Sequence, residues 1–159
     1  MQGGNKYQMN KQDKKEYVII SNNDTLEKYK EYYFKKYPRR KVFPIKEPCH
    51  PSINTWFILQ RPSMNKLKQD WKEYIIWLAT DYGLANKNIK KCKLTYIYHR
   101  PTKRRADCDN LTPKFTNDGL VEANVIVDDS YFCCNPLVIY LDYSKNNPSM
   151  EIHIEVIED

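Results

Sequence analysis

Two neighbouring segments decide the class of fold: KCKLTYIYH, residues 91–99, and TPKFTNDGLVEANVIV, residues 112–127. The first alternates apolar with polar residues, which predicts a strand. The second opens on Thr112 as N-cap and Pro113 at the first helical position, which predicts a helix to about Val121. It ends in a short apolar run that predicts a strand or a turn. We therefore expect a strand and a helix joined by a polar loop.

The same reasoning extends on both sides of these segments. The apolar run 53–60 predicts a strand, and apolar residues at helical spacing predict a helix over 66–80 that Gly83 ends. Downstream, the patterns of 137–143 and 151–157 predict two further strands. The order β-α-β-α-β-β predicts an α+β domain, in which a mixed sheet carries two helices on one face.

We expect this domain to cover residues 42–159 and to follow a basic N-terminal extension, residues 1–41. The extension holds 11 Lys and Arg against 5 Asp and Glu, which accounts for the whole net charge of +6. Its polar residues 1–16 predict disorder. A short strand is predicted over 17–20, and Asp24 to Glu27 form a capping box that predicts a helix to about Lys36.

The predicted helix of the extension is rich in both tyrosine and lysine. Aromatic side chains interleaved with lysines can stack on nucleic-acid bases, but we favour packing of the aromatic face on the core. Residues 41–51 contain three prolines and predict an edge strand and a loop.

Composition indicates a cytoplasmic protein of one main domain. A length of 159 residues suffices for a buried core. No apolar run approaches a membrane span, the polar start contains no signal peptide, and we expect no membrane partner. The five cysteines are odd in number and lack C-x-x-C spacing, which indicates reduced thiols. Cys49-His50 could be half of a zinc site, although a structural role is favoured because no second pair follows.

Candidate metal ligands follow a basic run. Residues 87–105 hold eight Lys and Arg and no acid, and Asp107 and Asp109 come directly after them. On an extended segment, side chains two residues apart point the same way, so these carboxylates could bind Mg²⁺ or Mn²⁺. A third carboxylate from Asp128-Asp129 could complete the site. Carboxylates, a divalent metal and arginines suit phosphodiester hydrolysis.

These residues resemble the signature of RusA-type Holliday junction resolvases, small endonucleases that are often phage-encoded. The resemblance covers about residues 42–157. It rests on Pro51-Ser52-Ile53-Asn54, Asp107-x-Asp109-Asn110-Leu111, Lys114, Asp118-Gly119-Leu120 and Val125 to Asp129. It implies a Mg²⁺-dependent homodimer, in a bacterial or phage-infected cytoplasm, that resolves four-way DNA junctions by paired symmetric nicks.

The resemblance also implies residue roles. Asp107, Asp109 and Asp129 would hold the metal. Lys114 would bind the phosphate, although the family's lysine often stands one residue earlier, where this chain has Pro113. Asp128 would orient a metal ligand or water, with a turn role as the alternative. Five residues are candidates for DNA contact, namely Lys103, Arg104, Arg105, Asn54 and Asn110; both asparagines could instead close turns.

Three other interpretations of the Asp-x-Asp motif were weighed. An EF-hand requires oxygen and glycine where this chain has Leu111 and Thr112. A glycosyltransferase would need a nucleotide-binding domain for which the chain has no room. A non-catalytic module that binds branched DNA on a resolvase scaffold stays open, and Pro113 in the lysine position favours it.

Overall fold

The computed structural model describes residues 15–157, which contain both strands and helices. In chain order they are β1 (Glu16–Asn22), α1 (Asn23–Lys36), α2 (Ile53–Trp56), α3 (Arg61–Asp81), β2 (Cys92–Arg100), the 3₁₀ turn η1 (Cys108–Leu111), α4 (Lys114–Glu122), β3 (Cys134–Tyr143) and β4 (Ser149–Val156). The expected disorder of residues 1–14 lies outside the described residues, and Glu16 already belongs to a strand.

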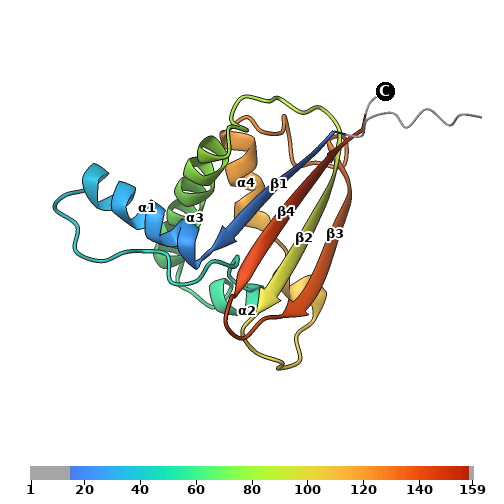
Figure 1. Cartoon of the computed structure of the whole chain (residues 1–159). Helices are drawn as coiled ribbons and strands as arrows, with labels where there is room; N and C mark the ends of the chain where they lie inside the picture. Colours follow the sequence, from blue (N-terminus) through green and yellow to red (C-terminus); the bar gives the residue numbers. More distant parts are fainter. Residues whose placement is uncertain (1–14, 158–159) are drawn as a thin grey trace, which may run out of the picture.

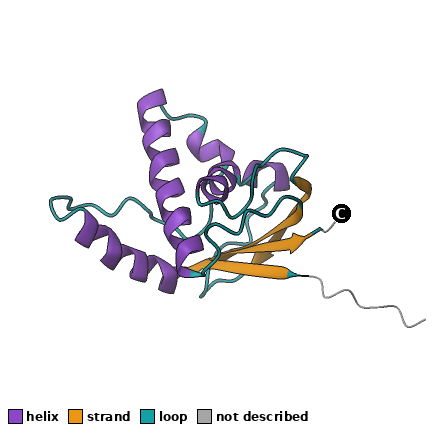
Figure 2. Cartoon of the chain, turned by 90° about the horizontal axis from the view of Figure 1, so that it is seen from above, coloured by secondary structure: helices purple, strands orange, loops and turns teal. Residues whose placement is uncertain are grey.

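The four strands form one mixed sheet in the order β1-β4-β2-β3, in which only β2 and β3 are parallel. The helices gather on one side of it (Figures 1 and 2). Leu94, Tyr96 and Tyr98 of β2 are fully buried on that side, whereas the residues between them are half-buried on the other. The predicted α+β class with a mixed sheet is confirmed, and so is the alternation that predicted β2.

The segment that charge placed in an N-terminal extension is part of the same core. Strand β1 forms an edge of the sheet by pairing with β4. Tyr29 and Tyr33 of α1 are buried, and the Tyr29 ring lies 5.3 Å from that of Trp77 in α3. Packing of the aromatic face on the core is therefore confirmed for these two tyrosines. The hydroxyl of Tyr74 in α3 adds a 2.7 Å hydrogen bond to Ser21 of β1.

The N-cap of helix α1 lies two residues before the start of the predicted capping box. Asn22 is the N-cap: its side chain accepts the Thr25 N–H at 2.9 Å, and Thr25 Oγ1 accepts the Asn22 N–H at 2.9 Å. The box of Asp24 and Glu27 is therefore wrong, because Asn22 and Thr25 form the capping box two residues upstream.

The predicted strand over 53–60 is also wrong. Ser52 caps the short helix α2 by accepting the Thr55 N–H, and the chain continues through a turn to α3. Phe57 and Ile58 are 72% and 81% exposed, so their hydrophobicity does not indicate burial. The edge strand expected within 41–51 is absent too, and that segment is a loop.

Close packing of α3 against α4 positions the candidate residues. A Cβ on Gly119 would lie 2.8 Å from Ile75 Cβ, so only glycine permits this approach. Beside it, Trp71 Nε1 donates to Thr116 Oγ1 at 2.7 Å in the buried interface. Close packing of α4 on α3 thus explains why the Asp118-Gly119-Leu120 motif contains a glycine.

Candidate functional site

The Asp-x-Asp motif forms a tight turn rather than an extended segment. Asp107 precedes η1, and its carbonyl accepts the Asn110 N–H at 3.1 Å. Thr112 Oγ1 donates to the Asp109 carbonyl at 2.8 Å. The expectation of two carboxylates side by side on an extended segment is therefore wrong, because Asp109 lies inside the turn. Both aspartates are exposed.

Two contacts fix η1 to the rest of the molecule. Tyr98 of β2 donates its hydroxyl to the Leu111 carbonyl at 2.8 Å. Asn110 Oδ1 accepts the Asn54 N–H of α2 at 3.1 Å. The structure thus brings together the two asparagines that the sequence proposed for DNA contact, and the Asn110 side chain joins two turns.

Lys114 is the first residue of α4, and its side chain is exposed. Neither Thr112 nor Pro113 caps the helix with a side chain, so the predicted cap is wrong. The cap comes instead from His50, whose Nε2 accepts the Phe115 N–H at 3.0 Å. Burial lowers the pKa of His50 to about 3, so the imidazole stays neutral and donates Nδ1–H to the Pro51 carbonyl.

Sequence reasoning missed this role of His50. The sequence favoured a structural role for the Cys49-His50 pair over half of a zinc site, but it did not indicate a helix cap. A structural role is confirmed for His50 by its two hydrogen bonds. No local signal could have found it, because His50 and Phe115 are 65 residues apart.

Asp128 and Asp129 lie in the loop that precedes β3. Asp128 Oδ1 accepts the Asp129 N–H at 2.9 Å, and hydrogen bonds from Ser130 and Asp129 lower the pKa of Asp128. The pKa of Asp129 is raised by partial burial and then by the charge of Asp118 in α4. Asp118 and Asp129 therefore form a pair of neighbouring carboxylates. Lys68 of α3 lies 3.7 Å from Asp118 and offsets part of its charge.

The predicted set of three metal carboxylates is not assembled in this conformation. Within residues 15–157, only a cysteine cluster places three potential ligand atoms within 4.8 Å of one another. The oxygen donors nevertheless fit a hard divalent cation, because Asp118 and Asp129 carry like charges close together. Sequence reasoning placed Asp118 in the resemblance motif without a metal-binding role, and so missed its interaction with Asp129.

The basic loop that precedes η1 is exposed. Arg100 Nη1 donates to the Arg104 carbonyl at 2.8 Å, and Lys103 Nζ lies 4.9 Å from the centre of the Tyr143 ring. Arg105 lies 3.9 Å from Asp107, and their side chains are 92% and 71% exposed. Such an exposed pair contributes little to stability, so these cations are available to an anionic partner.

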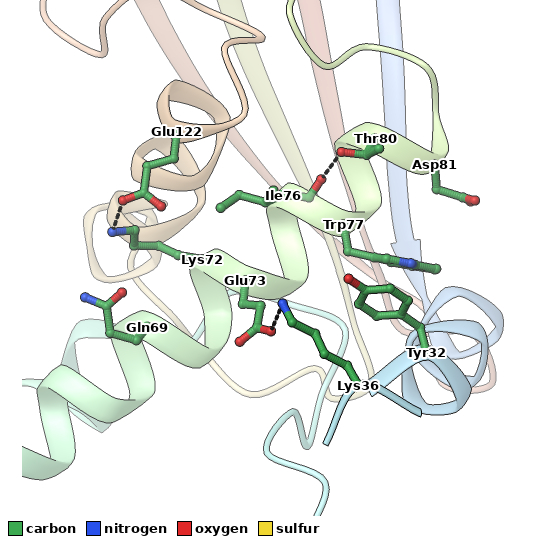
Figure 3. A pocket seen from close by; sticks show the side chains of 10 residues that line it. All are labelled: Tyr32, Lys36, Gln69, Lys72, Glu73, Ile76, Trp77, Thr80, Asp81 and Glu122. Carbon is green, nitrogen blue, oxygen red and sulfur yellow. Dashed lines mark hydrogen bonds and ion pairs between the residues drawn. The ribbon is translucent and has the colours of Figure 1, made fainter. Parts of the chain in front are cut away.

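A hollow of about 670 Å³ lies elsewhere, between α1, α3 and α4 (Figure 3). Its charges are mutually paired: Lys36 binds Glu73 at 3.0 Å, and Lys72 binds Glu122 at 2.5 Å. None of the predicted site residues lines it. We therefore assign it no role in the candidate site.

Comparison with models of known protein families and with curated proteins found no match to this chain. Among the helices in the described part of the chain, none is long and apolar enough to cross a membrane.

Proposed function

We propose that the chain is a Mg²⁺-dependent endodeoxyribonuclease that resolves four-way DNA junctions, as its resemblance to RusA-type resolvases implies. The proposal is supported by the electrostatic interaction between Asp118 and Asp129, which come from separate segments of the motif: after burial, the charge of Asp118 raises the pKa of Asp129. Two neighbouring carboxylates repel each other unless a proton or a cation lies between them, and a divalent metal is the cation that phosphodiester hydrolysis uses.

The register of α4 supports Lys114 as the phosphate-binding lysine. Residues four apart lie on one face of a helix, so Lys114 and Asp118 share a face, one turn apart. The exposed ammonium is thus placed on the side of α4 that also presents the carboxylate pair. The shift of this lysine by one residue, caused by Pro113, therefore leaves it beside the acidic group.

In the proposed mechanism, Asp129 and Asp118 would hold a Mg²⁺ ion, which would supply hydroxide near neutral pH and stabilise charge on the leaving oxygen. Asp129 and Asp118 provide carboxylate ligands. Asp107 and Asp109, on the turn η1, are the further candidate ligands. Lys114 and the arginines of the basic loop bind the non-bridging phosphate oxygens.

A C2 homodimer completes the proposal. A four-way junction presents two equivalent strands, and one metal site per chain can cut both only in a symmetric dimer. Exposed apolar residues such as Phe57, Ile58 and Phe132 offer surface for a partner or for DNA bases.

A cleavage assay on a labelled synthetic four-way junction, with and without Mg²⁺, tests the function. We expect paired symmetric nicks in the presence of Mg²⁺ and no cleavage in its absence. Asp107→Asn, Asp109→Asn and Asp129→Asn should each abolish cleavage yet keep or tighten junction binding, because they remove negative charge. Asp128→Asn should do less. Asp142→Asn is the matched control, since this exposed carboxylate pairs with His99 away from the motif.

The alternative is a non-catalytic module that binds branched DNA. It is favoured by one observation: Asp107 and Asp109 do not converge with Asp129 in this conformation. A junction gel shift without Mg²⁺-dependent cutting would select this alternative. Near wild-type cleavage by Asp129→Asn would overturn the metal assignment itself.

A further inference from the structure

Three buried cysteines meet where β2 and β3 begin. Cys92 and Cys134 are the first residues of these two parallel strands and are direct partners in the sheet register. Cys133 precedes Cys134 in the turn. Cys92 is 0% exposed, Cys133 is 3% exposed and Cys134 is 9% exposed. The three sulfur atoms lie within 4.8 Å of one another, and Cys92 Sγ is 3.8 Å from Cys134 Sγ.

These separations match those of thiolates that share one metal ion. A Zn–S distance of about 2.3 Å implies sulfurs about 3.8 Å apart at a tetrahedral angle and about 4.0 Å apart in a trigonal plane. The Cys92–Cys134 separation already has the tetrahedral value. The remaining separations reach it through side-chain shifts of about 1 Å or less.

The thiols have only weak partners at present. Cys133 Sγ lies 3.5 Å from the Ile89 carbonyl, and Cys134 Sγ lies 3.5 Å from the Asp128 carbonyl. Contact with Cys92 and burial raise the pKa of Cys134, and burial raises that of Cys133. Without a cation Cys133 and Cys134 stay protonated, and protonated thiols resemble small apolar side chains. A bound cation instead favours the deprotonated thiolates.

We propose that Cys92, Cys133 and Cys134 form a three-thiolate site for a thiophilic d¹⁰ ion, Zn²⁺ or Cu⁺. Binding releases one proton from each thiol and changes no oxidation state. The resulting centre carries a charge of −1 with Zn²⁺ or −2 with Cu⁺. For Zn²⁺, a water would supply the fourth ligand. Lysines on both sides of Cys92, Lys90 and Lys93, provide compensating charge nearby in the chain.

The site would also fix the loop that carries Asp128 and Asp129. The N–H groups of Cys133 and Cys134 both donate to the Ser130 carbonyl, at 3.0 and 2.8 Å. An ion held by these cysteines therefore restrains the turn directly after the two aspartates. The ion site itself does not depend on the proposed nuclease activity, and its test requires no DNA.

The test uses the full-length, reduced, chelator-washed protein. Zn²⁺, or Cu⁺ without oxygen, is titrated against a chromophoric competing chelator, and native mass spectrometry counts bound ions. We expect one equivalent in the wild type and in Cys108→Ser, the matched control with an exposed thiol. Cys92→Ser and Cys134→Ser should each lower affinity by more than the roughly 10- to 100-fold that loss of an outer contact costs. The ion that the protein binds more tightly against the competing chelator is the one assigned to the site.

A second measurement avoids any failure of a variant to fold. In the wild type, one equivalent of the ion should slow alkylation of Cys92, Cys133 and Cys134 in mild denaturant, as read by peptide mass mapping, and leave Cys108 unchanged. The proposal is overturned if neither ion binds at one equivalent. It is equally overturned if the ion protects Cys49 or Cys108 instead of the cluster.

Discussion

Acidification should destabilise this protein through His50. The imidazole is 2% exposed, caps α4 by accepting the Phe115 N–H, and has its pKa lowered by burial to about 3. In the unfolded chain, the same group takes up a proton as the pH falls through about 6.5. The unfolded state therefore binds the proton first, so the stability present above pH 6.5 is lost as the pH falls.

The magnitude follows from linkage. Between pH 7 and pH 5, the free energy of unfolding should fall by about 2 kcal/mol from His50 alone. For a chain of this size that corresponds to a melting temperature lower by roughly 4–8 °C. Carboxylates whose pKa is lowered, such as Glu151 and Asp142, act mainly below their ordinary values of 4.5 and 3.8, outside this window.

His50→Gln isolates the effect, because glutamine offers an acceptor for the Phe115 N–H and does not titrate. Urea unfolding of wild type and variant at pH 7, 6 and 5 should show the stability difference shrinking by about 2 kcal/mol across the range. Tyr96→Phe is the control: it also removes a buried hydrogen bond, to Asn117 Oδ1, but it should keep the wild-type pH dependence. A difference between wild type and His50→Gln that stays the same at pH 7 and pH 5 would refute a neutral, buried His50.

Three further outcomes are expected. Trp71→Phe should cost about 1–3 kcal/mol in urea unfolding, because Thr116 loses its buried donor. Gly119→Ala should cost about 1–3 kcal/mol in the same measurement, since its Cβ would lie 2.8 Å from Ile75; an unchanged midpoint would contradict the close approach. Replacement of residues 103–105 by alanine should weaken junction binding and flatten the slope of log K against log salt by roughly 0.9 per lost phosphate contact. An unchanged slope in filter-binding titrations would mean that these cations do not touch DNA.

Elements with a strong local period were predictable. Helix α3 (Arg61–Asp81) contains the predicted 66–80, and β2 (Cys92–Arg100) nearly coincides with the predicted 91–99. Each of these elements buries one face, so the spacing of its apolar residues predicts whether it is a helix or a strand. Residues 53–60 failed because that apolar run has no period and is largely exposed, with Ser52 supplying a helix cap that competes with a strand.

The candidate site was less predictable, because it depends on contacts between distant segments. The motif predicted that Asp107 and Asp109 lie on an extended segment, whereas Asp109 lies within the tight turn η1. The pair of Asp118 with Asp129 requires α4 and the following loop to fold back together. The cysteine cluster requires the parallel register of β2 with β3, which joins Cys92 to a residue 42 positions away.

Charge misled the division into domains for a related reason. Residues 1–41 hold the excess of basic side chains, yet within them β1 pairs with β4 and α1 buries Tyr29 and Tyr33. Charge describes the surface, whereas membership of a domain is decided by the apolar residues beneath it. A truncation at Lys41 would remove an edge strand and part of the aromatic core, so it would test folding and not DNA contact. Single substitutions of exposed lysines in α1, such as Lys28 and Lys35, are therefore the way to ask whether this segment meets DNA.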